Sequence, residues 1–358
     1  MASNESYFEG NRKELFKLHK ELIEIESISG NVGIYLKDYL EKRGYTVEWQ
    51  VVPEKLGRER ANLYAYKGSK RDTKVLLTSH IDTVPPFFGY RIEDDRIYGR
   101  GSVDDKNCVA AMIVALEELI DEKEVEVDDV ALLFVVEEEI GGPGMQFANE
   151  HLGVDSWKAV IFGEPTEMKL GVGHKGIIIF KYAVEGKAAH SGYPELGINA
   201  NEILIKALAR LVGTKLPDSH LLGESTINIG ELAGGVAVNV IPENASAFIA
   251  IRVADNTEEI VRIVNEIADS TPHLSVEDLH SVDPQLLDYK VEGFDNIVLK
   301  YATDVPYLKK KSGEPFKRFL YGSGSIHVAH SDHEFVPIKE LYDSVDGYKR
   351  LVTYSLKN

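Results

Sequence analysis

The feature that most constrains the fold is a series of short apolar segments that alternate with segments of helical periodicity. Residues 74–79, 130–136 and 159–162 are apolar runs of strand length, and residues 107–119 and 142–151 have the length and pattern of helices. Strands that alternate with helices commonly pair into a sheet covered by helices. The sequence therefore predicts an α/β fold.

Further segments extend this first domain at both ends of the chain. Two helices are predicted around Leu15–Ile25 and Ile34–Leu40, and the second is predicted to stop at Gly44, because glycine often follows a helix C-terminus. The other predicted elements are strands at residues 45–52, 62–66 and 316–321 and a C-terminal helix from about residue 340.

The pattern changes after Gly176. Residues 177–288 contain strand-like and helical segments in the order βαββαβ, which is typical of a ferredoxin-like sheet with helices on one face. The segments are strands at 177–184, 226–232, 245–253 and 274–279 and helices at 199–211 and 258–268. We therefore predict an inserted domain at residues 177–288 and a second domain built from residues 1–176 and 289–358.

Charge and cysteine content restrict the partners and the cellular environment. The formal net charge of −18 disfavours binding to nucleic acid and to anionic membranes, although it can attract a cationic substrate or simply aid solubility. No apolar run approaches the roughly 18 residues of a membrane span, and the polar N-terminus does not resemble a secretion signal. Cys108 is the only cysteine, so an intrachain disulfide is impossible and nitrogen and oxygen must hold any metal. We expect a cytoplasmic protein.

Residues suited to metal binding follow the predicted strands, beginning with His80 and Asp82. Both come after the apolar segment 74–79 and point to the same side of an extended chain. Asp82 can therefore orient the imidazole of a metal-bound histidine. A structural hydrogen bond between the two side chains explains the pair equally well.

Four more candidates are ambiguous when each is taken alone. Asp104 and Asp105 precede a predicted helix, where capping of the helix N-terminus is the competing interpretation. Glu164 follows the strand at 159–162, and His330 lies in a polar segment near the C-terminus.

Three adjacent glutamates, Glu137 to Glu139, follow the strand at 130–136. Their mutual repulsion is explained either by full solvation or by a bound cation. Neighbouring side chains alternate in direction, so one glutamate can coordinate metal while the next holds a water. Because four of the five motifs follow successive strands, one sheet edge would gather them into a single site.

Together these motifs resemble the acetylornithine deacetylase and succinyl-diaminopimelate desuccinylase family of dizinc metallopeptidases, which also includes aminoacylase-1 and glutamate carboxypeptidase. The resemblance spans essentially the whole chain. It rests on His80-Ile81-Asp82, Gly99-Arg100-Gly101 before Asp104-Asp105-Lys106, Glu138-Glu139 before Gly141-Gly142, Gly163-Glu164-Pro165, and His330 followed by Glu334.

The resemblance implies two zinc ions in each subunit, with cobalt or manganese as substitutes. It places one zinc on His80 and Glu164, the second on Glu139 and His330, and Asp104 as the bridge between them.

The resemblance also implies the roles of neighbouring residues. Asp82 would orient His80. Glu138 would be the general base, which takes a proton from the attacking water and passes it to the leaving nitrogen. The peptide bond between Asp104 and Asp105 would be cis.

In the inserted domain, the resemblance implies a lid and dimerisation role. His190 would reach into the site of a partner subunit to stabilise the oxyanion, so a homodimer is expected. Asn239 and Arg252 match substrate-binding positions, and the planar guanidinium of Arg252 suits a free carboxylate. A surface arginine on a lid strand is the alternative for Arg252.

The predicted activity is hydrolysis of the amide bond of an N-acyl amino acid, with N-acetylornithine or N-acetyl-lysine as the first candidates. The alternative is a dizinc carboxypeptidase or dipeptidase that acts on short peptides, because only the pocket differs between these reactions. A non-hydrolytic binding protein of the same fold is disfavoured, since the motifs include every ligand and the base. The expected partner is thus a small molecule.

Overall fold

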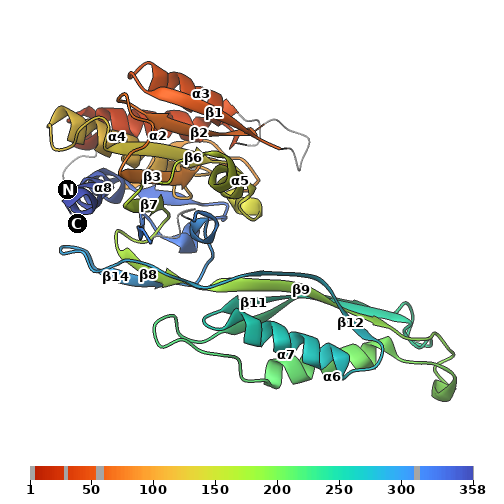
Figure 1. The fold of residues 1–358 in the computed structure, drawn as a ribbon. Coiled ribbons are helices and arrows are strands. Elements are labelled where there is room, and N and C mark those ends of the chain that lie inside the picture. The colour runs from red at the N-terminus through yellow and green to blue at the C-terminus, as the bar shows by residue number, and fades with distance from the viewer. Residues whose placement is uncertain (1–4, 28–30, 54–59, 310–314, 358) are drawn as a thin grey trace. The chain divides into compact units, whose positions relative to one another are not determined.

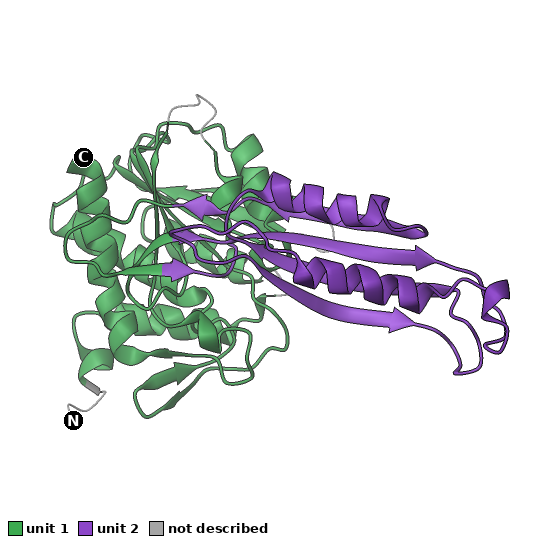
Figure 2. Ribbon diagram, turned by 90° about the horizontal axis from the view of Figure 1, so that it is seen from below, with its two compact units in different colours: residues 1–172, 287–297, 303–358 green, residues 173–286, 298–302 purple. Residues whose placement is uncertain are grey.

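The computed structural model describes residues 5–27, 31–53, 60–309 and 315–357, and the chain divides into two compact units. Unit 1 contains residues 1–172, 287–297 and 303–358, and unit 2 contains residues 173–286 and 298–302 (Figure 2). The sequence predicted that the inserted domain covers residues 177–288. It did not predict that residues 298–302 also belong to unit 2. The chain changes unit inside β8 (Leu170–His174) and β14 (Asn296–Leu299), and again after residues 286 and 302.

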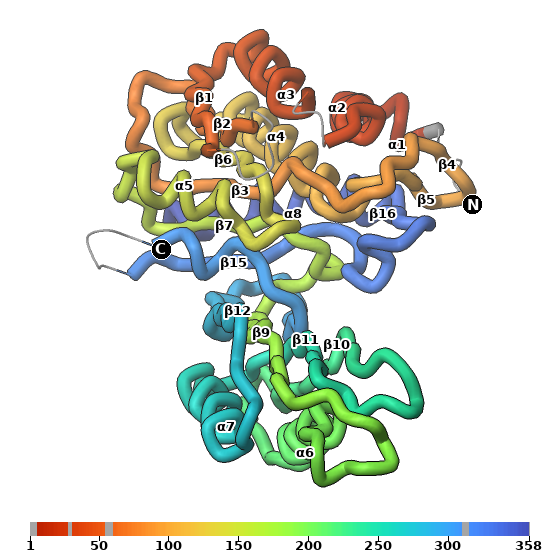
Figure 3. The backbone as a smooth tube through the Cα atoms, turned by 90° about the vertical axis from the view of Figure 1, so that its right-hand side faces the viewer, coloured from red at the N-terminus to blue at the C-terminus, as the bar shows by residue number. Residues whose placement is uncertain are grey.

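Unit 1 is built around a six-stranded sheet with the order β1-β2-β6-β3-β7-β15. The strands are β1 (Thr46–Val52), β2 (Arg60–Tyr66), β3 (Val75–His80), β6 (Val130–Val135), β7 (Ala159–Gly163) and β15 (Lys317–Tyr321). Strands β6, β3, β7 and β15 are parallel, whereas β2 is antiparallel to both β1 and β6. All residues of β3, β6 and β7 are buried, as in central strands covered on both faces. The late strand β15 lies beside β7 (Figure 3).

Six helices in the described part of the chain complete the core of unit 1 (Figure 1). They are α1 (Glu5–Glu9), α2 (Lys13–Glu24), α3 (Asn31–Glu41), α4 (Lys106–Asp121), α5 (Pro143–His151) and α8 (Ile338–Lys357). Helices α3, α4, α5 and α8 contact strands of the sheet, whereas α2 contacts α4 and α1 contacts α2. Helix α4 is buried along most of its length and contacts α2, α8 and strands β3 and β6. Among the described residues, no helix is both long and apolar enough to cross a membrane.

Unit 2 has the predicted βαββαβ order. Its elements are β9 (Gly176–Glu185), α6 (Ala200–Gly213), β10 (Thr226–Gly234), β11 (Asn244–Val253), α7 (Thr257–Asp269) and β12 (Leu274–Val282). The sheet is antiparallel with the order β10-β11-β9-β12, and α6 and α7 cover one face (Figure 1). Burial alternates along β9, so Ile178, Phe180 and Tyr182 face the helices.

The predicted α/β fold with a mixed, helix-covered sheet is confirmed. Gly44 follows α3 with a φ of 84°, as expected for the glycine after a helix. The sequence did not predict several short strands of two to five residues. These are β4 (Arg91–Glu93), β5 (Arg96–Tyr98) and β16 (Phe335–Pro337) in one sheet, and β8, β13 (Gln285–Leu286) and β14 in another.

Candidate metal centre

The candidate site lies at the carboxyl ends of three parallel strands. Strands β6, β3 and β7 are neighbours, and they end at Val135, His80 and Gly163. The carboxyl ends of parallel strands lie at one edge of a sheet. The chain segments that carry Glu138 and Glu164 therefore leave the sheet at the edge that carries His80, as the order of the motifs predicted.

His80, Asp104 and Glu139 form the centre of the site, since one ligand atom from each lies within 4.8 Å of the others. One carboxylate oxygen of Asp104 is 3.0 Å from Nε2 of His80, and the other is 3.2 Å from Nε2 of His330. Nε2 of His330 is also 3.0 Å from a carboxylate oxygen of Glu139. Asp104 thus lies between two histidines and presents one oxygen to each. Imidazole nitrogens and carboxylate oxygens are a donor set that zinc and related divalent ions accept, so these residues fit a metal.

The cluster attracts positive charge. Hydrogen bonds to Asp104 and Glu139 raise the pKa of His330 to about 10. Burial lowers the pKa of His80, but hydrogen bonds to Asp104 and Asp82 outweigh this effect and raise the pKa well above its ordinary value. Burial likewise opposes ionisation of Asp104, yet the two histidines hold its pKa below the usual range. The two histidines thus stabilise the ionised form of Asp104, whereas burial raises the pKa of Glu139.

Glu138 and Glu164 lie beside the same site, where Glu164 is buried and Glu138 is half-buried. Burial raises the pKa of both carboxyl groups well above the ordinary value, and neighbouring carboxylates add to the shift. Those neighbours include Asp304 and Glu139 for Glu138, and Glu138 itself for Glu164. A glutamate with a raised pKa accepts a proton readily near neutral pH, as a general base must. Glu164 is buried beside the centre but is not part of the cluster within 4.8 Å.

Asp82 has a wider structural role than the sequence predicted. Nδ1 of His80 lies closer to the backbone oxygen of Asp82, at 3.1 Å, than to its carboxylate, at 3.5 Å. The Asp82 carboxylate instead accepts hydrogen bonds from the backbone N–H groups of Glu138, at 3.2 Å, and Glu139, at 3.3 Å. Asp82 therefore holds the glutamate segment as well as the histidine.

The helix-capping alternative for the aspartate pair is wrong. Asp105 occupies the N-cap position of α4, but its side chain makes no capping hydrogen bond. Its carboxylate accepts a hydrogen bond from the Ser79 hydroxyl at 2.5 Å, which links the pair to the end of β3. The peptide bond between Asp104 and Asp105 is cis, as the resemblance implies.

A buried ion pair supports the segment that carries Asp104. Arg100 and Glu334 are 2% and 1% exposed, and their side chains meet at 2.7 Å. The other Glu334 oxygen accepts hydrogen bonds from the backbone N–H groups of Val103, at 3.0 Å, and Asp104, at 3.2 Å. The sequence motifs contained both charged residues but gave no sign that they pair across 234 positions.

We expect Glu334→Gln to lower the free energy of unfolding by about 3 to 5 kcal/mol, because Arg100 would remain as a buried charge without a counter-ion. Urea unfolding measures this loss. Glu277→Gln is the matched control, since Glu277 pairs with Lys181 at the solvent-exposed surface, and it should cost far less stability than Glu334→Gln. Equal losses in the two variants would contradict the structural role of the buried pair.

The three predicted lid residues all lie in unit 2. His190 and Asn239 are on adjacent segments, because the backbone N–H of Ser191 donates to the backbone carbonyl oxygen of Asn239 at 3.1 Å. Arg252 lies near the far end of β11, whose first residue is Asn244. At about 3.3 Å per residue, Arg252 is roughly 26 Å along the strand from Asn244. The structure therefore brings His190 and Asn239 together and leaves Arg252 apart from them.

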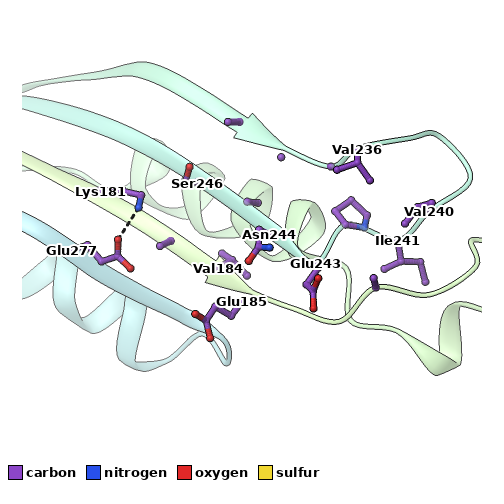
Figure 4. A pocket seen from close by; sticks show the side chains of 17 residues that line it. Lys181, Val184, Glu185, Val236, Val240, Ile241, Glu243, Asn244, Ser246 and Glu277 are labelled. Atoms are coloured by element: carbon purple, nitrogen blue, oxygen red, sulfur yellow. Dashed lines mark hydrogen bonds and ion pairs between the residues drawn. The ribbon is translucent and has the colours of Figure 1, made fainter.

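A groove of about 460 Å³ lies beside the Asn239 segment of unit 2 (Figure 4). Apolar side chains such as Val236 and Ile241 form part of its wall, and Lys181 pairs with Glu277 at 2.7 Å. No histidine or cysteine is among the described residues that line it. The groove therefore lacks the donor set found in unit 1.

The comparisons with known proteins agree on one protein family. The chain matches Peptidase family M20/M25/M40 over residues 76–354. It is 50% identical to a peptidase M20 domain-containing protein of Schizosaccharomyces pombe, over 96% of this chain and 85% of the relative. It is 42% identical to a protein of Aspergillus terreus named probable carboxypeptidase, over 93% of this chain and 84% of the relative. A crystal structure of a tripeptidase from Staphylococcus aureus shares the fold, with a TM-score of 0.79 and 22% identity over 97% of this chain and 99% of that one.

The matched residues include every candidate ligand from His80 to His330. The match identifies the larger family and does not single out the deacetylase and desuccinylase branch to which the motifs were compared. The fold, the extent of the match and the histidine and carboxylate cluster agree. The chain therefore belongs to peptidase family M20/M25/M40 and is a metallopeptidase of that family.

Proposed function

We propose that this metallopeptidase hydrolyses short peptides with two zinc ions, as a carboxypeptidase or dipeptidase. The observation that carries the proposal is the position of Asp104, which presents one oxygen to His80 and the other to His330. Glu138 follows β6 at the same edge of the sheet, where it can serve as the base.

The proposed ligands divide into two sets that share Asp104. His80 and Glu164 would hold one cation, and Glu139 and His330 would hold the other. When bound there, divalent cations supply Lewis acidity toward a carbonyl oxygen and activate water as a nucleophile.

The residues of the chain then handle the protons. Glu138 accepts a proton from the water that attacks the scissile carbonyl and delivers it to the leaving nitrogen, whose bond to the carbonyl carbon breaks. Asp82 keeps Glu138 and Glu139 in place through their backbone N–H groups. Glu164 is buried, which keeps bulk water away from its side of the site.

Peptide hydrolysis is favoured over deacetylation by the names of relatives. The Aspergillus terreus relative is named probable carboxypeptidase, and the Staphylococcus aureus structure is that of a tripeptidase. Arg252 is partly buried, and its guanidinium suits the free carboxylate of a peptide. Deacetylation of N-acetylornithine or N-acetyl-lysine, which the sequence first suggested, remains the competing activity.

A hydrolysis panel tests the substrate class. The zinc-loaded protein is incubated with dipeptides, tripeptides, N-blocked dipeptides with a free carboxylate, N-acetylornithine and N-acetyl-lysine, each with and without chelator. We expect chelator-sensitive release of amino acids from peptides, with a kcat/KM at least about tenfold above that for the acetylated amino acids. A higher kcat/KM for N-acetylornithine would overturn the proposal in favour of deacetylation.

We also infer a homodimer in which His190 acts at the site of the partner. Support comes from the separation of His190 and Asn239 from Arg252, which a second copy can bridge. The edge strand β10 adds support, because almost all of its residues are exposed and Leu232 is 62% exposed. Exposed apolar edge strands readily pair with another chain.

Mixing two inactive variants tests the action of His190 in trans. We expect His190→Ala and Glu138→Gln to be nearly inactive alone and to regain up to about a quarter of wild-type activity when mixed, because random pairing forms one intact site in half of the dimers. The measurement is peptide hydrolysis after the mixture has exchanged subunits. No regain, in a mixture shown by size to contain dimers, would place His190 at the site of its own chain.

A further inference from the structure

Asp304 is a buried carboxylate to which neither the motifs nor the proposed chemistry assign a role. It is 6% exposed, and its Oδ1 atom has no hydrogen-bond partner among the described residues. It begins a short 3₁₀ turn, η4 (Val305–Tyr307), in unit 1, where it makes no capping hydrogen bond with its side chain. Burying a carboxylate without a partner is costly. The position therefore requires an explanation other than packing.

A second buried polar atom lies nearby. The hydroxyl of Thr78, on β3, is 1% exposed as a residue and has no hydrogen-bond partner among the described residues. Thr78 and Asp304 line the same small cavity, together with Glu138 and Glu164. The carboxyl groups of Asp304, Glu138 and Glu164 line this space of about 10 Å³ together with His80 and the hydroxyl residues Thr78, Ser79 and Thr303. A space of roughly 10 to 15 Å³ holds a single water when two to four polar groups surround it.

We propose that Asp304 and Thr78 hold one buried water that fixes the carboxyl group of Glu138, a positioning role that depends on the proposed function of Glu138 as the base. The Thr78 hydroxyl donates to the water oxygen. The water donates one hydrogen bond to Oδ1 of Asp304 and the other to the Glu138 carboxylate. The two lining atoms without a partner, Thr78 Oγ1 and Asp304 Oδ1, then each have one. Glu138 is held at its carboxyl end as well as at its backbone.

Gly142, the second glycine after the Glu138-Glu139 pair, fits this arrangement. Gly142 has a φ of 73°, which favours glycine, and a Cβ atom there would lie 2.6 Å from Oδ1 of Asp304 and 2.6 Å from the ring of Tyr307. A side chain at position 142 would therefore push Asp304 away from the glutamate segment.

A double-mutant cycle in the zinc-loaded protein tests the shared water. Thr78→Val removes the hydroxyl and Asp304→Leu removes the carboxylate, each with little change in shape. We expect each to lower kcat for the best peptide by roughly tenfold to a hundredfold, with KM and zinc content unchanged. The double variant should be no slower than the slower single variant, because both lose the same water. A double variant whose loss equals the product of the two single losses would overturn the proposal.

Conservative and control variants separate positioning from general damage. Thr78→Ser and Asp304→Asn keep a hydroxyl or an acceptor oxygen and should retain most of kcat. Thr257→Val is the matched control, because Thr257 is another buried threonine whose hydroxyl has no partner among the described residues, but it lies in unit 2. Its kcat should equal that of the wild type. A Thr78→Ser variant as slow as Thr78→Val would contradict a role for the hydroxyl.

Crystallography gives a readout that does not depend on activity. A high-resolution structure of the zinc-loaded wild type should show density for one water between Thr78, Asp304 and Glu138, and the Thr78→Val structure should show none. An empty cavity in the wild type would overturn the inference even if peptides are hydrolysed. Conversely, a wild type that hydrolyses no peptide would overturn the proposed function. The presence of the water would still be decided by the electron density.

Discussion

Glu138→Gln should lower kcat for peptide hydrolysis by roughly 10²- to 10⁴-fold, the range for loss of a general base. The amide has nearly the same shape as the carboxylate but cannot accept the proton from the attacking water. Because Glu138 is not one of the proposed ligands, zinc content should stay at the wild-type level. Steady-state kinetics and elemental analysis of the same sample measure both quantities.

Glu137→Gln is the matched control for this variant. It makes the same change one residue earlier, at a position whose backbone has a φ of 63° and which lies outside the ligand cluster. We expect its kcat to remain within a few-fold of the wild type. If Glu137→Gln were the slow variant and Glu138→Gln the normal one, the roles assigned along the glutamate run would be shifted by one residue.

Asp104→Ala should remove both metal ions and lower kcat by roughly 10³-fold or more, since metal ions contribute several kcal/mol of transition-state stabilisation and each 1.4 kcal/mol is a factor of ten. The geometric reason is that the two oxygens of Asp104 face different histidines. No other proposed ligand belongs to both sets.

The metal content of variants distinguishes a ligand shared by two metal ions from a ligand of one metal ion. Elemental analysis of dialysed protein should give close to no zinc for Asp104→Ala and about one zinc per chain for Glu139→Ala, which loses a ligand of one set only. Circular dichroism confirms that both variants are folded. Full occupancy in Asp104→Ala, or equal losses in the two variants, would contradict the bridging role.

The motifs predicted much of the candidate site because His80, Glu138 and Glu164 lie at or just after the ends of neighbouring strands. Apolar segments of strand length identified β3, β6 and β7, and parallel strands place their carboxyl ends at one edge. The order of His80, Glu138 and Glu164 after those strands was therefore informative before any distance was known. The same logic could not identify Asp304, which follows no strand of the main sheet and belongs to no recognisable motif.

Contacts between distant segments required the tertiary structure. Arg100 and Glu334 stand in separate motifs, and only the folded chain shows that they form one buried pair beneath Asp104. Asp82 is a similar case: its spacing from His80 predicted an interaction with the imidazole, whereas folding directs its carboxylate to two backbone N–H groups. A carboxylate accepts whichever donors the fold presents, and sequence spacing does not specify these.

The sequence by itself determined the α/β class, the βαββαβ insert and the residue types of a metal centre, because periodicity and local spacing encode local structure. The tertiary structure alone decided which oxygen of Asp104 faces which histidine, and that His190 and Arg252 lie at opposite ends of the unit 2 sheet. The physical reason is the separation along the chain over which each effect acts. Backbone periodicity acts over a few residues, whereas a metal site is made by side chains that only long-range packing brings together.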